Sequence, residues 1–232
     1  MEDYKKSIIK DLDYFVFKKD RLGVFRDAIE FNALNVAIHT TADKQQERID
    51  RMKEILSAYG DETDKKKFQS VCGNITEMLA GMLDNYGDHL GEIYMEISPK
   101  QKSSGQYFTP YCVSKLMAHL NIDELFQEEI PKKVVTFNDP CCGSGGMLVA
   151  VADVLNERKF NYTNDALFVA NDIDRTCVYM CYLQTSFAGM PAVVKHQDTL
   201  TQECWDSFVT PAYALQYPKF NRIYNNLNAP AM

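Results

Sequence analysis

The sequence of 232 residues lacks several features that define special classes of protein. No run approaches the roughly 18 apolar residues that span a membrane, and the charged start Met1–Lys6 leads into no apolar signal segment. The seven cysteines do not supply two Cys-x₂₋₄-Cys pairs, which argues against a four-cysteine zinc site. We therefore expect no membrane segment, no metal, and reduced thiols in a cytoplasmic protein.

Basic residues are outnumbered, with 25 Lys and Arg against 32 Asp and Glu and a formal net charge of −7. A broad, sequence-independent grip on phosphates needs clustered Lys and Arg, so the composition argues against one. If nucleic acid is the substrate, a partner or a missing domain has to hold it. The content that is present, 46% hydrophobic and 25% charged, is typical of a globular protein of one large or two small domains.

The first 98 residues show three apolar stripes at helical spacing. They fall within residues 25–37, 49–59 and 68–86. Asp64 is the expected N-cap of the third helix and Gly87 its expected end. No pattern of chemistry accompanies these stripes, so we predict a helical domain over residues 1–98 that serves packing or partner binding.

A polar segment, Ser98–Gly105, marks the expected boundary with a second domain over residues 99–232. The run Gln106-Tyr107-Phe108-Thr109-Pro110 follows it and precedes a further helical pattern. Thr109 as N-cap and Pro110 at the first helical position form a complete start signal. Capping explains these two residues but not the run in front of them.

A glycine-rich turn lies at the centre of the second domain. Val134–Phe137 is an expected buried strand that Asp139-Pro140 ends, and three glycines within four residues, at 143, 145 and 146, lead into an apolar helical pattern. Strand, glycine turn and helix together let a ligand approach the backbone and lie at a helix N-terminus. The glycines alone fit equally well a tight turn in any α/β protein.

Taken together, Gly105–Pro110 and Asp139–Leu148 closely resemble two motifs of the modification (M) subunit of type I restriction systems, within the N6-adenine DNA methyltransferase family. Leu90–Tyr94 is also similar to the helix that precedes the first of these motifs. The resemblance covers roughly residues 90–200. It implies an α/β fold, with a Rossmann-like S-adenosylmethionine-dependent methyltransferase sheet, apparently shortened, behind the N-terminal helical domain.

The resemblance implies that both motifs bind S-adenosylmethionine. Asp139 to Gly145 would cradle its methionyl part and ammonium group, while Thr109 and Pro110 would close over that end from the other side. An acid at a strand end suits a cationic ammonium or sulfonium group. The cofactor residues expected from the two motifs are Gln106, Tyr107, Phe108, Thr109, Pro110, Asp139, Pro140, Cys141, Gly143, Ser144 and Gly145.

A second buried strand is expected at Ala166–Asn171, with Asp172-Ile173 at its end. Acids at this place in nucleotide-binding α/β folds bond ribose hydroxyls. Asp172, beside Ile173, matches the ribose-binding acid of the family, although a structural role for it stays open. Asp174 is the expected N-cap of the next helix.

Ala192–His196 is the expected third strand, and Asp198-Thr199 follow it. Asp198 matches the family's aspartate that bonds the adenine amino group of the cofactor. We therefore count Asp198 and Thr199 among the expected cofactor residues.

The catalytic motif of the family departs most from this sequence. Members carry an Asn/Asp-Pro-Pro-aromatic loop at the end of a fourth strand, whose acceptors bind the hydrogens of the target amino group and raise its electron density. Phe220–Asn226 is the expected fourth strand here, followed by Leu227-Asn228-Ala229 in place of Pro-Pro-aromatic. Asn226 is the one candidate catalytic residue that matches. The chain would thus be a truncated piece or a shortened relative.

These observations lead to one main hypothesis and two alternatives. The main one is S-adenosylmethionine-dependent N6-adenine DNA methylation of the restriction-modification type, with DNA reached through a specificity subunit or missing recognition domain in a hetero-oligomer. The first alternative is a catalytically impaired, cofactor-binding scaffold or DNA-complex subunit. The second is methylation of a protein glutamine, which would need the same missing loop.

Overall fold

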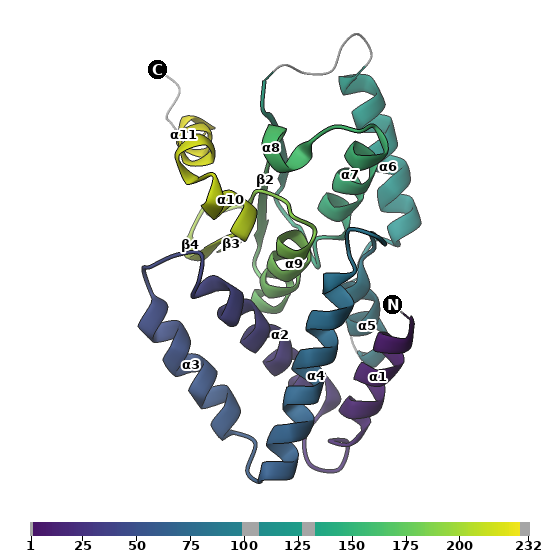
Figure 1. Ribbon diagram of the computed structural model, residues 1–232, viewed down its shortest axis with the longest axis vertical. Helices are drawn as coiled ribbons and strands as arrows, with labels where there is room; N and C mark the ends of the chain where they lie inside the picture. Colours follow the sequence, from purple (N-terminus) through teal and green to yellow (C-terminus); the bar gives the residue numbers. More distant parts are fainter. Residues whose placement is uncertain (1, 99–106, 127–132, 228–232) are drawn as a thin grey trace.

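The computed structural model describes residues 2–98, 107–126 and 133–227 (Figure 1). Its N-terminal part is helical, as predicted, and occupies the lower half of Figure 1. The helices of this part are α1 (Glu2–Asp13), α2 (Arg21–Ala37), α3 (Gln45–Ser57), α4 (Glu62–Ala80) and α5 (His89–Ile97).

The three predicted apolar stripes fall on α2, α3 and α4, although the second and third extend past the ends of their helices at Ser57 and Ala80. The start of α4 differs from the prediction, because Asp61 is the N-cap and its Oδ1 accepts the backbone N–H of Asp64 at 2.8 Å. The helix also ends at Ala80, before Gly87. Two acids three residues apart both suit an N-cap, and the sequence pattern could not choose between them.

The second part of the chain alternates strands and helices. Its strands form one sheet in the order β1-β2-β3-β4, with β1 to β3 parallel and β4 antiparallel to β3. The elements are α6 (Tyr111–Leu125), β1 (Val135–Asp139), α7 (Gly146–Glu157), α8 (Tyr162–Asp165), β2 (Ala166–Asp172), α9 (Arg175–Phe187), β3 (Ala192–Gln197), β4 (Cys204–Val209), α10 (Pro211–Leu215) and α11 (Tyr217–Leu227).

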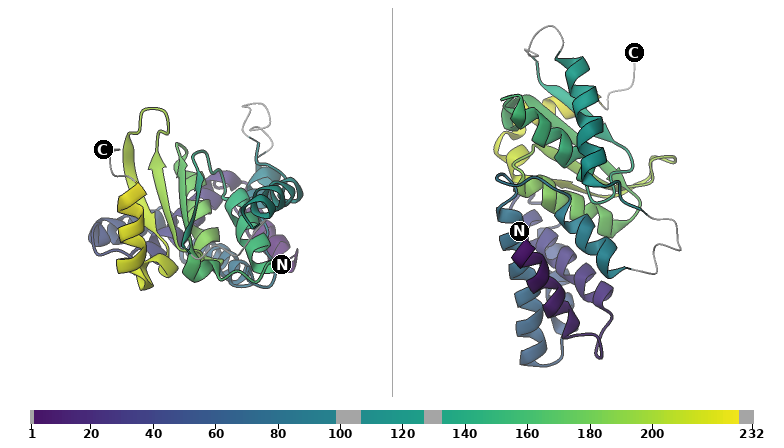
Figure 2. Two further views of the ribbon diagram at one scale, coloured as in Figure 1. Left: turned by 90° about the horizontal axis from the view of Figure 1, so that it is seen from above. Right: turned by 90° about the vertical axis from the view of Figure 1, so that its right-hand side faces the viewer.

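Helices cover both faces of the sheet (Figure 2). Neighbouring residues of a strand point to opposite faces, so Phe168 and Val194 pack in the large core with α9, while Leu167 and Val193 pack with Phe220 of α11. This arrangement is a short, Rossmann-like α/β sheet, as expected. The carboxyl ends of β1 and β2 lie at the same edge, where Asp139 pairs in register with Ala170.

The expected fourth strand at Phe220–Asn226 is wrong, because these residues lie in α11. The apolar residues Phe220, Ile223 and Tyr224 recur at helical spacing, and a strand would scatter them over both faces. Phe220 is fully buried against the sheet, whereas Asn226 is exposed. The helical period and the available sheet face therefore prevail over the resemblance. The hairpin strand β4 was not foreseen.

One cluster of buried residues runs from Ile8 in α1 to Phe208 in β4. The helix α2 packs on α9, so the helical part and the sheet share this core. The division into domains at residue 98 stays a prediction. Within the described ranges, no helix is both long and apolar enough to cross a membrane.

Candidate functional site

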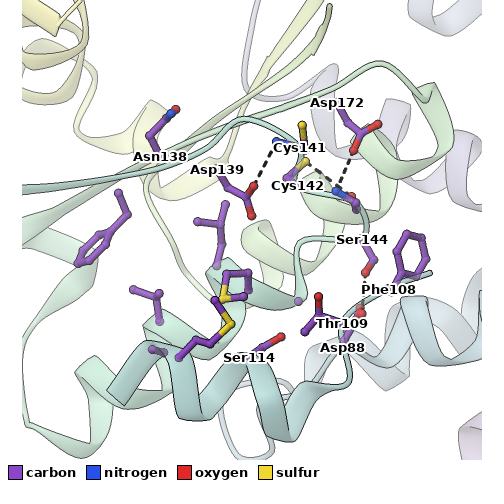
Figure 3. A pocket seen from close by; sticks show the side chains of 18 of the residues that line it. Asp88, Phe108, Thr109, Ser114, Asn138, Asp139, Cys141, Cys142, Ser144 and Asp172 are labelled. Atoms are coloured by element: carbon purple, nitrogen blue, oxygen red, sulfur yellow. Dashed lines mark hydrogen bonds between the residues drawn. The ribbon is translucent and has the colours of Figure 1, made fainter. Parts of the chain in front are cut away.

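A cavity of about 700 Å³ lies between the start of α6, the glycine turn and the ends of β1 and β2 (Figure 3). Cavities of roughly 300–1,000 Å³ are the usual size for small-molecule and cofactor sites. The predicted residues that line it are Tyr107, Phe108, Thr109, Asp139, Cys141, Gly143, Ser144 and Asp172. Both sequence motifs therefore contribute walls to one cavity.

The glycine turn has a backbone shape that side chains would oppose. Gly143 has φ +53° and Gly145 has φ +91°, both in the left-handed region that glycine adopts without strain. A Cβ on Gly143 would lie 3.1 Å from the ring of Phe108. The N–H of Cys142 donates to the carbonyl of Asn171 at 2.9 Å, which ties the turn to the end of β2. The turn is thus open on its cavity side and fixed behind.

Two acids at neighbouring strand ends bind the same turn. The N–H of Gly143 donates to Asp172 Oδ2 at 2.8 Å, and the N–H of Cys141 donates to Asp139 Oδ1 at 3.2 Å (Figure 3). Asp172 Oδ1 accepts the N–H of Asp174 at 2.8 Å. Each acid therefore has a structural bond, and each also lines the cavity.

Burial raises the pKa of Asp139 above its ordinary value, and the nearby charge of Asp172 raises it further. A carboxyl with a raised pKa is one whose ionised form lacks compensation. A cation in the cavity would supply that compensation. The charge of this wall suits an ammonium or sulfonium group.

The opposite wall is the segment before α6. Phe108 packs on Tyr94 of α5 with ring centroids 5.5 Å apart, and Thr109 faces the glycine turn across the cavity (Figure 3). The helix begins at Tyr111 with Pro110, and not Thr109, at the N-cap, one residue later than predicted. Thr109 is therefore available to the cavity.

Several predicted cofactor residues do not line this cavity. The Asp198 carboxylate accepts the N–H groups of Leu200 and Thr201 in its own turn, and Thr199 Oγ1 donates to the carbonyl of Pro140. The segment with Asp198 and Thr199 therefore contacts the glycine turn at Pro140 but does not line the cavity. Gln106 lies outside the described residues. The predicted residues away from the cavity are Pro110, Pro140, Gly145, Ile173, Asp198, Thr199 and the candidate catalytic Asn226.

The structure adds residues that sequence reasoning missed. Asp88, the N-cap of α5, lines the cavity, as do Asn138 at the end of β1 and Met117 and Asn121 on α6. An acid one residue before a helical pattern was a visible capping signal for Asp88. Its place in the cavity depends on contacts far apart in the sequence. In the described residues no group of three or more His, Cys, Asp and Glu could hold a metal.

Comparison with known proteins gives a family and several relatives. A family model described as N-6 DNA Methylase matches residues 85–231. A type I restriction enzyme MpnII methylase subunit from Mycoplasma pneumoniae is 26% identical over 196 residues, which make up 82% of this chain and 31% of that protein. The chain thus spans less than a third of the length of this curated relative.

Two solved structures also match. A Listeria monocytogenes protein described as a putative class I S-adenosylmethionine-dependent methyltransferase is 14% identical, with a TM-score of 0.39 over 75% of this chain and 54% of that one. A type I restriction-modification methyltransferase subunit from Streptococcus thermophilus is 14% identical, with a TM-score of 0.38 over 82% of this chain and 56% of that one.

Proposed function

Because the chain belongs to the N-6 DNA methylase family, we propose that it is a S-adenosylmethionine-dependent subunit for methylation of adenine N6 in DNA. The family membership confirms the resemblance drawn from the two motifs, and the expected cofactor follows from it. Methyl transfer, the DNA substrate and the partner are proposals for this chain.

The observation that carries the proposal is the bond from the Gly143 N–H to Asp172 Oδ2. It joins two predicted cofactor residues 29 positions apart, one in the turn after β1 and one at the end of β2, at one cavity. Such a strand-end crevice is where open α/β sheets bind nucleotides. Carboxylate oxygens keep lone pairs for hydroxyl donors, which fits Asp172 beside a ribose.

The chain's own residues would bind and orient the cofactor. Bound S-adenosylmethionine supplies an electrophilic methyl group on a sulfonium. Asp139 would face the positive end, the Phe108 ring would shield the turn from water, and Thr109 would close the opposite wall. Residues with these roles must line the cavity, and Asp139, Phe108 and Thr109 all line it.

DNA contact is proposed to need a partner. The Mycoplasma pneumoniae relative is by name a methylase subunit of a restriction enzyme, and the net charge of −7 makes an independent grip on phosphates unfavourable. We propose a specificity subunit or recognition domain as the DNA-holding component of a hetero-oligomer.

A second function, a cofactor-binding subunit without turnover, is favoured by one specific observation. Asn226, the one residue that matches the catalytic loop, is exposed on α11 and does not line the cavity. An amide that accepts the hydrogens of the target amine must lie within hydrogen-bond reach of that amine, and the amine must lie beside the methyl donor in the cavity.

One experiment separates the two functions. Transfer of tritiated methyl from S-adenosylmethionine to adenine in DNA is measured with the chain alone and with candidate specificity subunits, beside calorimetric binding of the cofactor. Transfer that Asn226→Ala abolishes supports the enzyme. Binding without transfer under every condition supports the second function, and absence of binding contradicts both.

A further inference from the structure

A buried acid connects the helical part of the chain to the glycine turn. Asp88 is only 4% exposed, yet it lines the cavity. Its Oδ2 accepts the hydroxyl proton of Ser144 at 2.6 Å, and its Oδ1 accepts the N–H of Gly91 at 3.1 Å and Nε2 of Gln184 at 2.9 Å. Three donors from three elements satisfy one carboxylate. Burial raises its pKa, and the bonds from Ser144 and Gln184 oppose that rise.

Gln184 of α9 also holds the Asp88 carboxylate in place. Its side chain is fully buried and donates to the Ser144 carbonyl at 2.7 Å as well as to Asp88, while its Oε1 accepts the N–H of Leu90 at 3.2 Å. The first turn of α5, the glycine turn and α9 therefore form one closed network of hydrogen bonds.

Two glycines, Gly91 and Gly146, leave room for the Asp88 carboxylate. A Cβ on Gly91 would lie 2.2 Å from Asp88 Oδ2, and a Cβ on Gly146 would lie 2.9 Å from the same atom. Real Cβ atoms do not approach so closely, so a side chain at either place would displace the Asp88 carboxylate from its present position. The missing side chains at Gly91 and Gly146 thus leave the space in which the Asp88 carboxylate packs against the glycine turn.

The direction of the Ser144 bond decides what the cavity offers. A serine hydroxyl has one proton and two acceptor lone pairs. The Ser144 hydroxyl donates its proton in the hydrogen bond to Asp88, so only its oxygen lone pairs remain available to a ligand. Such a hydroxyl accepts from a donor group, for example an ammonium, and does not compete with it.

We propose that Asp88 is a positioning residue of the cofactor site, which orients the Ser144 hydroxyl and holds the glycine turn so that the ammonium end of S-adenosylmethionine is accepted. The inference rests on the proposed function. It also makes the start of α5, outside both sequence motifs, a part of the site.

The substitution Asp88→Asn tests the direction of the bond at nearly constant volume. At the Oδ1 place the new amide nitrogen would face two donors, Gly91 N–H and Gln184. At the Oδ2 place it faces only the Ser144 hydroxyl, which can rotate and accept. The hydroxyl proton is then free to point into the cavity, toward the cationic donor.

We therefore expect Asp88→Asn to weaken calorimetric S-adenosylmethionine binding about tenfold, the factor that corresponds to one charge-assisted hydrogen bond. Ser144→Ala should weaken binding similarly. In the Ser144→Ala background, Asp88→Asn should add less than about twofold, because residues that act through each other are non-additive.

Asp11 supplies a control. It is also a buried carboxylate with a serine donor and an amide donor, Ser70 at 2.5 Å and Asn74 at 3.3 Å, although it additionally forms an ion pair with Lys67 at 2.9 Å, and it does not line the cavity. Asp11→Asn should lower the thermal midpoint without changing cofactor affinity. A purely structural Asp88 would behave in the same way.

The outcomes separate the two proposals. If wild type binds no S-adenosylmethionine, the proposed function fails. If wild type binds and Asp88→Asn binds equally well, or if the two substitutions are additive, the role of Asp88 is overturned while the function stands. If Asp88→Asn does not fold, Ser144→Ala carries the test, and unchanged affinity in that variant overturns the inference.

Discussion

The substitution Gly145→Ala tests whether the glycine turn has the shape on which the site depends. Gly145 has φ +91°, and a Cβ there would lie 2.9 Å from Cys181 Sγ and 3.0 Å from Cys181 Cα. The second atom belongs to the backbone of α9, so a side-chain rotation cannot remove the contact. The helix or the turn has to move.

Two penalties add for this variant. A residue with a Cβ in the left-handed region costs about 1–2 kcal/mol, and forcing an extra methyl group into a packed interior costs about 1–3 kcal/mol. Gly145→Ala should therefore lower the free energy of unfolding by about 2–5 kcal/mol. That is a large part of the roughly 5–15 kcal/mol that stabilises a typical domain.

Gly73→Ala is the matched control. Gly73 lies exposed in α4, and a Cβ there meets no atom within 4 Å. Alanine is favoured over glycine inside a helix by roughly 0.5–1 kcal/mol, so this variant should gain stability.

Urea unfolding followed by circular dichroism measures both variants against wild type, and cofactor calorimetry follows on the folded fraction. Equal free energies of unfolding for wild type and Gly145→Ala would refute the geometry of the turn. A loss of the same size in Gly73→Ala would show that the effect is not specific to it.

Three further outcomes are expected. Asp172→Ala should weaken S-adenosylmethionine binding more than Asp198→Ala in calorimetry, because each acid accepts two backbone N–H groups but only Asp172 lines the cavity; a larger effect at Asp198 would reverse the assignment. Phe168→Ala should lower the free energy of unfolding in urea by about 3–5 kcal/mol, because Phe168 is fully buried and stacks on Phe137. Phe17→Ala, at a side chain that is 99% exposed, should change it by under about 0.5 kcal/mol. Similar losses in the two variants would contradict the burial of Phe168 in the core. Burial raises the pKa of Asp139, so the unliganded fold favours its neutral form, and the contribution of Asp139 to stability is present at low pH and lost as pH rises through the folded-state pKa. Cation binding needs the ionised carboxylate, so cofactor affinity should fall as pH drops through that raised pKa. Asp139→Asn should flatten this dependence when binding is titrated over pH.

Local patterns in the sequence predicted three of the strands and the glycine turn beside the cavity. Val134–Phe137, Ala166–Asn171 and Ala192–His196 are short apolar runs with turn signals at their ends, and they form β1, β2 and β3 within two residues of the expected bounds. Strands β2 and β3 are mostly buried, as their apolar composition predicts. The expected burial of the first strand was wrong, because β1 lies at the edge of the sheet and its residues alternate between half-buried and exposed.

The resemblance misled at α11, where a family alignment competed with periodicity. Phe220, Ile223 and Tyr224 fit a helix that covers one sheet face, and the fold follows this spacing. The period of the pattern is a direct physical signal, because it decides whether apolar groups share one face. A strand assignment that ignored it was wrong.

The Asp88 network was beyond reach of local patterns for a different reason. Asp88 meets Ser144 across 56 positions and Gln184 across 96. Each residue alone has an ordinary local explanation, as an N-cap, a turn residue and a helix residue. Only the packing of α5 and α9 against the glycine turn brings them to one point.

The location of the cofactor is tested most directly through the thiols of the chain. Cys141 is exposed and lines the cavity, while Cys112 and Cys204 are exposed and do not line it. Alkylation by iodoacetamide is followed for each cysteine by peptide mass spectrometry, with and without saturating S-adenosylmethionine. We expect slower alkylation of Cys141 with unchanged rates at Cys112 and Cys204. Unchanged alkylation of Cys141 when calorimetry shows the cofactor bound would place it elsewhere and contradict the site.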